Sequence, residues 1–359
     1  MIRQFVPFDA LWNMAIDVPY SFLVREGSRA WSCGQLAMDG NAEVMFPGDL
    51  VRQSQVVCNY IREILERGGI TTDGLTRLLL YYVHSTQDEQ SRMTQVFRDH
   101  FGDGLIIDLV PVPHFYYDGI VLEVDLFSGG PAILSKSTSA AGGCVQVLDD
   151  GETAWISLDV PDVELKDGVA LLSATLQEHG LKPDATLSEH WFVPTPRLDT
   201  LCHQVEGLGQ HFDHGAIIGT GQGNTIISGR FTLLSSTAEL MSTEMTEIEG
   251  VRTICRSTPR ETWIQARVLS GAAGLVEQTR CLMPALEREL QKNELTFDDV
   301  VKSTTHYVGG ESEEDLHDNM RVRNRYYHRP GPASTGLPVF GFAEKDSRIV
   351  IDITAKPRS

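Results

Sequence analysis

Apolar residues recur with helical spacing at three places along the chain. In the first of these, Val57, Tyr60, Ile61, Ile64 and Leu65 fall at i, i+3, i+4, i+7 and i+8. That spacing places them on one face of an amphipathic helix. The corresponding face at the other two places is made by Leu172 and Leu176, and by Leu282, Ala285, Leu286 and Leu290. The pattern therefore predicts three helices, each with one buried face.

Each predicted helix lies in the same sequence context. A segment typical of a strand precedes it and carries Trp31, Trp155 or Trp263. A turn with an acidic residue follows it, and then comes a run that closes in aromatic and β-branched residues, as strands often do. The acids are Asp73, Asp184 and Asp298, and the closing runs are residues 81–83 (YYV), 191–193 (WFV) and 306–308 (HYV). A second helix and a closing strand pair are expected after each run.

A recurring order of elements is the signature of tandem repeats. We therefore predict three diverged copies of one α+β unit of about 120 residues in this 359-residue chain. The expected divisions are 1–130, 131–245 and 246–359. A chain of this length is also more compatible with two or three domains than with one core.

Composition and charge exclude several classes of protein. With 42% hydrophobic and 22% charged residues, the chain is expected to be globular throughout. A formal charge of -19 argues against nucleic-acid binding, because such binding depends mainly on Lys and Arg. The six cysteines show no paired spacing, which suggests reduced thiols. Without a signal-like or membrane-spanning apolar run, we expect a cytoplasmic protein that does not bind membranes.

Short motifs in the first copy resemble the Rid (YjgF) family. They are residues 18–21 (VPYS), 33–36 (CGQL) and 47–49 (PGD), and residues 295–302 and 332–336 of the third copy resemble later family segments. The resemblance implies chorismate-mutase-like units, each a mixed sheet with two helices on one face. It also implies trimers with a small-molecule cleft at each subunit boundary, and no cofactor. Three fused copies would make such a trimer within one chain, with three unlike clefts, and the protein would be a monomer or homodimer.

The resemblance also implies a site. Family members hold a substrate carboxylate with an arginine just after Pro-Ala in a late strand, where this sequence has Ser334. The family acid that orients water is matched by Glu123 in the first copy and replaced by Val350 in the third. Tyr20 and Cys33 match the family's tyrosine and small polar residue, so Glu123, Cys33 and Tyr20 are the candidate catalytic residues. Alternatively, Glu123 is an exposed strand residue, Cys33 a small buried one, and Tyr20 a packing residue.

The segment 113–119 (PHFYYDG) is a second candidate part of the site. His114, Tyr116, Tyr117 and Asp118 carry groups that donate protons or stack, and we interpret them as substrate-binding residues. His114 and Asp118 would serve as acid and base if burial brought their pKa values near neutrality. The alternative is an aromatic hairpin closed by an Asp-Gly turn.

Three histidines of the second copy are close in sequence. His203, His211 and His214 have no carboxylate or cysteine nearby to complete a metal site, so a surface cluster is the better interpretation. The sequence therefore predicts no metal.

These observations leave three hypotheses for the function. The first is a Rid-type hydrolase or deaminase that acts on an imine, enamine or related carbonyl metabolite in the cleft of the first copy. The second is a catalytically silent protein that binds a metabolite. The third is a chorismatase-like lyase or hydrolase, a class that also resembles a fused trimer but whose motifs are absent here.

Overall fold

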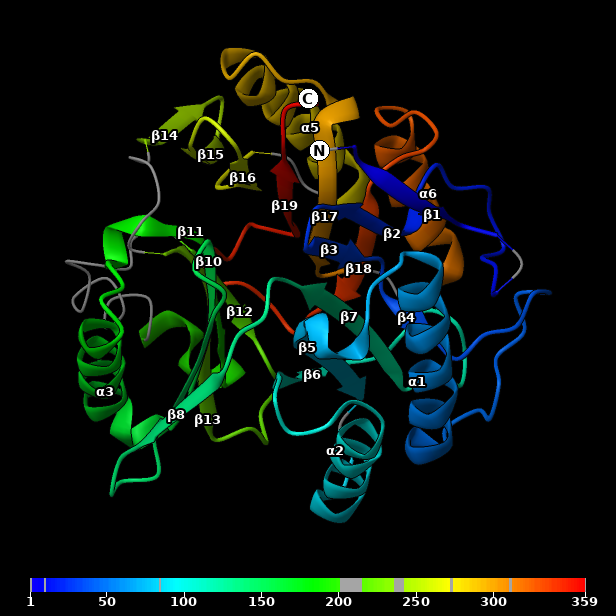
Figure 1. The fold of residues 1–359 in the computed structure, drawn as a ribbon. Coiled ribbons are helices and arrows are strands. Elements are labelled where there is room, and N and C mark those ends of the chain that lie inside the picture. The colour runs from blue at the N-terminus through cyan, green and yellow to red at the C-terminus, as the bar shows by residue number, and fades with distance from the viewer. Residues whose placement is uncertain are drawn as a thin grey trace.

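The computed structural model describes residues 1–359 except 1, 10, 84, 201–214, 236–241, 272–273, 310–311 and 359. The first unit contains β1 (Gln4–Pro7), β2 (Ser21–Glu26), β3 (Arg29–Ser32), β4 (Gln35–Leu36), α1 (Leu50–Arg67), β5 (Leu75–Val83), α2 (Gln87–Phe101), β6 (Ile106–Val112) and β7 (Leu122–Ser128) (Figure 1). Its strands are ordered β2-β3-β7-β5-β6, and only β5 and β6 pair in parallel.

The second and third units follow the same order, with the second helix expected for the second unit lying outside the described residues. The second contains β8 (Leu134–Thr138), β9 (Cys144–Asp149), β10 (Thr153–Pro161), α3 (Leu165–Glu178), β11 (Thr186–Val193), β12 (Ala216–Gly219) and β13 (Ile226–Leu234). The third contains β14 (Ser242–Ile248), β15 (Val251–Ser257), β16 (Thr262–Val268), α5 (Leu275–Lys292), β17 (Val300–Tyr307), α6 (Glu313–Asn324), β18 (Ala333–Pro338) and β19 (Ile349–Ala355). Their strand orders are β8-β9-β10-β13-β11-β12 and β14-β15-β16-β19-β17-β18.

The three tryptophans lie on equivalent strands. Trp31 is on β3, Trp155 on β10 and Trp263 on β16, and each of these strands pairs with the closing strand of its own unit. The three predicted acids are the central residues of 3₁₀ turns Thr72–Gly74, Pro183–Ala185 and Phe297–Asp299. The prediction of three α+β units of one kind is therefore confirmed.

Strand register gives a finer alignment than the sequence did. The central strand of each unit has an irregularity at the same place, and the first residues after it are Arg77, Ser188 and Lys302. Further along, Tyr81 lies opposite Glu123, Phe192 opposite Ser228, and His306 opposite Val350. The sequence pattern equated Trp191 with Tyr81 and His306, which was wrong by one residue, because Trp191 points to the opposite face of its strand and packs in the core of the second unit.

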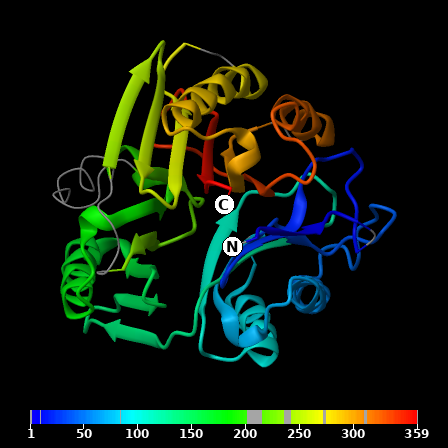
Figure 2. The same cartoon turned by 45° about the horizontal axis from the view of Figure 1, so that its top comes forward.

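The three units surround a common centre with their sheets inside and their helices outside (Figure 2). Within each unit, a hydrophobic core lies between sheet and helices. Each boundary carries a buried ion pair: Lys302–Asp125 at 2.9 Å, Arg230–Asp108 at 2.9 Å and Arg256–Glu189 at 3.4 Å. β18 also pairs with β2, which joins the third and first sheets. The chain is thus an intramolecular pseudo-trimer, as predicted.

Among the described helices, none has the length and apolar character required to cross a membrane.

Candidate functional site

A cavity lies at the boundary between the first and third units. Its volume is about 60 Å³, several times what one buried water needs. The first unit supplies lining residues from the segment before β2, from β4 and β7, and from the segment before β7, and the third supplies them from β17, α6 and β18. They include all four residues predicted from the family motifs, which are Tyr20, Cys33, Glu123 and Ser334.

Glu123 lies near the start of β7, opposite Tyr81 of β5 and Leu36 of β4. Only 6% of its surface is exposed, so it is not the exposed strand residue of the alternative interpretation. Burial raises the pKa of Glu123 well above its usual range, the neighbouring Asp125 raises it further, and Lys302 partly offsets the shift. Gly34 makes room for it, because a Cβ there would stand 1.7 Å from Glu123 Oε1.

Cys33 is a buried lining residue and not an activated nucleophile. Burial is the main cause that raises the pKa of its thiol, and the Gln35 amide lies 3.1 Å from Sγ. A cysteine becomes reactive when its pKa is lowered, which is the opposite change. The thiol therefore stays protonated and contributes shape and a weakly polar surface to the cavity.

Tyr20 packs against the third unit. Its ring meets that of Tyr327 edge-on with 5.9 Å between centroids. Burial raises the pKa of Tyr20, and Arg323 and Ser334 only partly offset the rise, so the hydroxyl is a neutral donor. Tyr20 is thus both a boundary packing residue and a cavity residue.

Only part of the segment 113–119 lines the cavity. Tyr116 and Tyr117 line the cavity, and Tyr117 Oη lies 3.3 Å from Nε2 of His317. Asp118 is exposed in a turn, while His114 lies beside Tyr116 with 5.2 Å between ring centroids. Neither His114 nor Asp118 lines the cavity, so the structure does not support them as its acid and base.

Sequence reasoning missed Arg323 of α6, which also lines the cavity. Arg323 is 2% exposed, its Nη1 donates to Thr305 Oγ1 at 3.1 Å, and its Nε has no hydrogen-bond partner in the described residues. No carboxylate of the described chain forms an ion pair with it. A sequence signal existed: Leu316, Met320 and Arg323 fall at i, i+4 and i+7, so the arginine stands on the apolar face of its helix.

This arrangement favours a small anion. A buried guanidinium without a carboxylate is costly, and a bidentate anion would satisfy it. The same cavity holds Glu123, and burial raises the pKa of its carboxyl group well above its usual range. Both groups line this cavity, although they come from different units.

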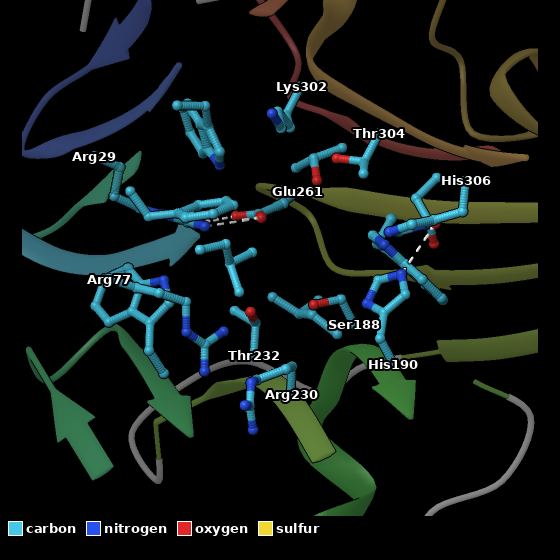
Figure 3. A pocket seen from close by; sticks show the side chains of 18 of the residues that line it. Arg29, Arg77, Ser188, His190, Arg230, Thr232, Glu261, Lys302, Thr304 and His306 are labelled. Carbon is cyan, nitrogen blue, oxygen red and sulfur yellow. Dashed lines mark hydrogen bonds and ion pairs between the residues drawn. The ribbon is translucent and has the colours of Figure 1, made fainter. Parts of the chain in front are cut away.

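A second cavity lies at the centre of the pseudo-trimer (Figure 3). All three repeat tryptophans line it, together with the ion pair between Arg29 and Glu261. It also contains His190, His306 and Asp352, which the sequence did not bring together. The histidines that the sequence did single out, His203, His211 and His214, lie outside the described residues.

Part of the chain is similar in sequence to known proteins. No protein-family model matches it. RutC family proteins of Pyrococcus horikoshii and Pyrococcus abyssi are each 25% identical to it over 85 residues, which is 24% of this chain. The matched part spans 66% and 65% of their lengths, slightly less than two thirds. This similarity confirms the predicted resemblance of the units to the Rid family.

Solved structures show likenesses in fold. A member of the YjgF/YER057c/UK114 family from Mycobacterium tuberculosis is 18% identical, covers 35% of this chain and 98% of its own, and has a TM-score of 0.29. A chorismatase is 12% identical, covers 79% of this chain and 93% of its own, and has a TM-score of 0.49.

Proposed function

We propose that the cavity between the first and third units hydrolyses the imine or enamine form of a small carboxylic acid to a carbonyl compound and ammonia. The observation that carries this proposal is that Glu123 and Arg323 line one enclosed cavity. The similarity to Rid-type units supports the same class of reaction.

Arg323 would bind the substrate carboxylate. Ser334 stands where the family resemblance implies an arginine, and the guanidinium of Arg323 reaches the same strand from α6. A Cβ built on Gly336 of β18 would lie 3.6 Å from Arg323 Nη2. Two parallel N–H donors would then fix both the position and the orientation of the substrate.

Glu123 would move the protons of the reaction. In its ionised form it accepts a proton from water while the water oxygen bonds to the carbon of the protonated C=N group, which gives a neutral carbinolamine. Glu123 then passes this proton to the nitrogen. As the C–N bond breaks and ammonia leaves, the carbinolamine hydroxyl becomes the carbonyl, gives its proton to Glu123, and Glu123 releases that proton to solvent. Water is consumed and ammonia released, so the reaction needs no oxidant or reductant. Neutral hydroxyls of Tyr20 and Tyr307 are available as donors in the cavity.

The direct test is ammonia release from imines generated freshly by an amino-acid oxidase. We expect the protein to accelerate the release above the spontaneous rate, and imines without a carboxylate to be poorer substrates. Saturable binding of the keto acid without any acceleration would instead support the silent binding protein. If the protein showed no turnover and no binding, the assignment of the site to this cavity would be contradicted.

A further inference from the structure

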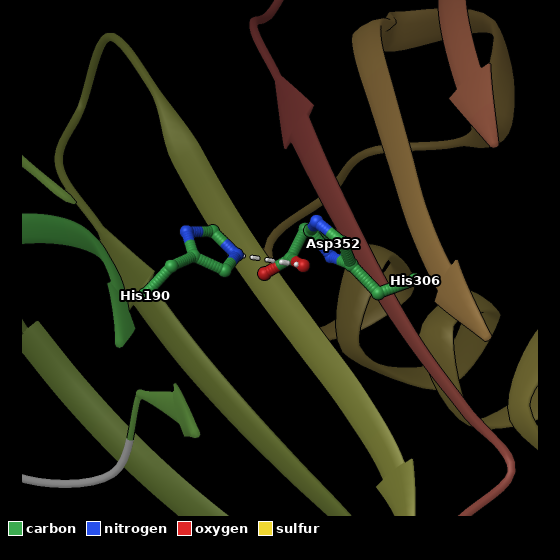
Figure 4. Close-up of side chains that lie close together, drawn as sticks. All are labelled: His190, His306 and Asp352. Atoms are coloured by element: carbon green, nitrogen blue, oxygen red, sulfur yellow. Dashed lines mark hydrogen bonds and ion pairs between the residues drawn. The ribbon is translucent and has the colours of Figure 1, made fainter. Parts of the chain in front are cut away.

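Three side chains with metal-ligating atoms meet at the boundary between the second and third units. His190 is on β11, His306 on β17 and Asp352 on β19, and they point toward one another (Figure 4). Their ligand atoms all lie within 4.8 Å of one another, and His190 Nε2 lies 3.0 Å from Asp352 Oδ2. The three residues also line the central cavity.

His306 has no hydrogen bonds to explain its position. It is 1% exposed, and neither ring nitrogen has a hydrogen-bond partner among the described residues. Two unsatisfied buried nitrogens on one imidazole are destabilising unless something else binds them. The ring is flanked by Phe192 and Tyr81, with 6.0 and 6.4 Å between centroids, so it is held beside Asp352 by packing.

Asp352 is held in place by a hydrogen bond to one of its carboxylate oxygens. Its Oδ1 accepts a hydrogen bond of 2.9 Å from Gln265 Nε2, which leaves Oδ2 toward His190. A hydrogen bond to the other carboxylate oxygen is a common outer-shell feature of metal sites.

Pseudo-symmetry indicates that a cation belongs there. Asp125 of the first unit lies opposite Leu79 as Asp352 lies opposite Thr304, so the two aspartates are equivalent. Asp125 pairs with Lys302 of the neighbouring unit at 2.9 Å. At the boundary between the second and third units, Ser188 stands at the position equivalent to Lys302. Within the described chain, no Lys or Arg forms an ion pair with Asp352.

We propose that His190, His306 and Asp352 bind a divalent transition-metal ion of the Zn²⁺ class, with its fourth position toward the central cavity. Two imidazoles and one carboxylate are a common set of protein ligands for such ions. Both ring nitrogens of His306 are buried without a hydrogen-bond partner among the described residues, so one of them is free to bind the ion. Because the ligands come from two units, the ion would tie the second unit to the third.

The test uses full-length, tag-free protein that has been dialysed against a chelator. Zn²⁺ is titrated by calorimetry, and Co²⁺ is followed by its visible absorption. We expect one ion per chain, and a Tm increase of at least ~3 °C at a free Zn²⁺ concentration ~100 times the Kd. His190→Ala and Asp352→Asn should each lower the affinity at least ~100-fold, above the effect usual for outer-shell partners.

His328→Ala is the matched control, because His328 Nδ1 makes a similar 2.9 Å pair with Asp298 but on the surface. It should retain the wild-type affinity. All three variants keep His203, His211 and His214, so a signal lost in His190→Ala does not come from them. Absence of one-to-one binding by the wild-type protein would overturn the proposal. Equal affinity in the wild type, His190→Ala and Asp352→Asn would overturn it too.

Discussion

Two boundaries of the pseudo-trimer show how one architecture can hold different chemistry. The cavity between the first and third units has a volume of about 60 Å³, whereas the cleft between the first and second units has a volume of about 690 Å³. In the second unit, Ser228 stands at the position equivalent to Glu123, and its hydroxyl donates to Asp159 Oδ1. Ser228 does not line the larger cleft, and the second unit has no acid at the position of Glu123.

The second helices of the first and third units, α2 and α6, also carry different residues at equivalent positions. Phe97 and Arg323 both stand 11 residues after the residue that caps their helix, Thr86 or Ser312 (97 − 86 = 11; 323 − 312 = 11). Phe97 is fully buried in the core of the first unit, whereas Arg323 lines the cavity of the third. The backbone is therefore retained while single side chains differ, so that a guanidinium lines one boundary and a phenyl ring takes its place in the core at the other.

The largest expected effect is on turnover in Glu123→Gln. The amide keeps the shape but cannot accept a proton, so the turnover number should fall at least ~100-fold while ligand binding remains. Ammonia release and calorimetry measure the two quantities. Ser228→Ala, at the position of the second unit equivalent to Glu123, should retain the wild-type turnover. Near wild-type turnover in Glu123→Gln would remove the catalytic distinction between the two boundaries.

Arg323→Met should reduce kcat/KM by ~10- to 100-fold for substrates that carry a carboxylate, because hydrogen bonds to charged groups are strong. The protein should not lose stability, since the variant removes a buried charge that has no acidic partner. Kinetics and thermal unfolding check the two expectations. A marked fall in Tm with unchanged kcat/KM would make Arg323 a structural residue. Arg323→Lys should rescue only partly, because it lacks the guanidinium fork.

Gly34→Ala tests whether the position of Glu123 matters. The new Cβ would stand 1.7 Å from Oε1, so the carboxylate must move. Turnover should fall by ~10-fold, since small misplacements of catalytic groups are costly. Gly104→Ala is the control, because no atom lies within 4 Å of its added Cβ. Equal activity in both variants would mean that the cavity tolerates displacement of Glu123.

The pH dependence should show the raised pKa of Glu123. As a base it must be ionised, so kcat/KM should increase as pH rises through its pKa, which burial raises well above the usual range of a glutamate. Stability has the opposite sign: the folded state binds this proton more tightly, so the contribution of Glu123 is present at low pH and is lost as pH rises through the folded pKa. The free energy of unfolding of the wild type and of Glu123→Gln, measured as a function of pH, would give this contribution. A pH-independent difference between them would contradict the shift.

The smallest effect is expected for Cys33→Ala. Its thiol is protonated, so removal should change turnover by no more than ~3-fold. A loss as large as that of Glu123→Gln would give Cys33 a chemical role despite its raised pKa. Ammonia release under identical conditions compares the two variants.

Much of the fold was readable in the sequence because local patterns determine local structure. The period of apolar residues predicted which faces of α1, α3 and α5 are buried, and the recurring tryptophans predicted equivalent strands. The family motifs also predicted that Tyr20, Cys33, Glu123 and Ser334 belong to one site. Motifs of this kind carry positions within a unit, and the pseudo-trimer brings those positions to the boundary.

The tertiary structure decided what each boundary contains. Arg323 lines the same cavity as Glu123 from 200 residues further along the chain, and His190 lies beside His306 and Asp352 from another unit. No spacing rule links such residues, because their separation in sequence reflects the lengths of whole units and their contact depends on how three sheets pack around one centre. The off-by-one alignment of Trp191 has a similar origin, since strand register is fixed by pairing and not by composition. The sequence thus determined the units, and packing between the units determined the chemistry at their boundaries.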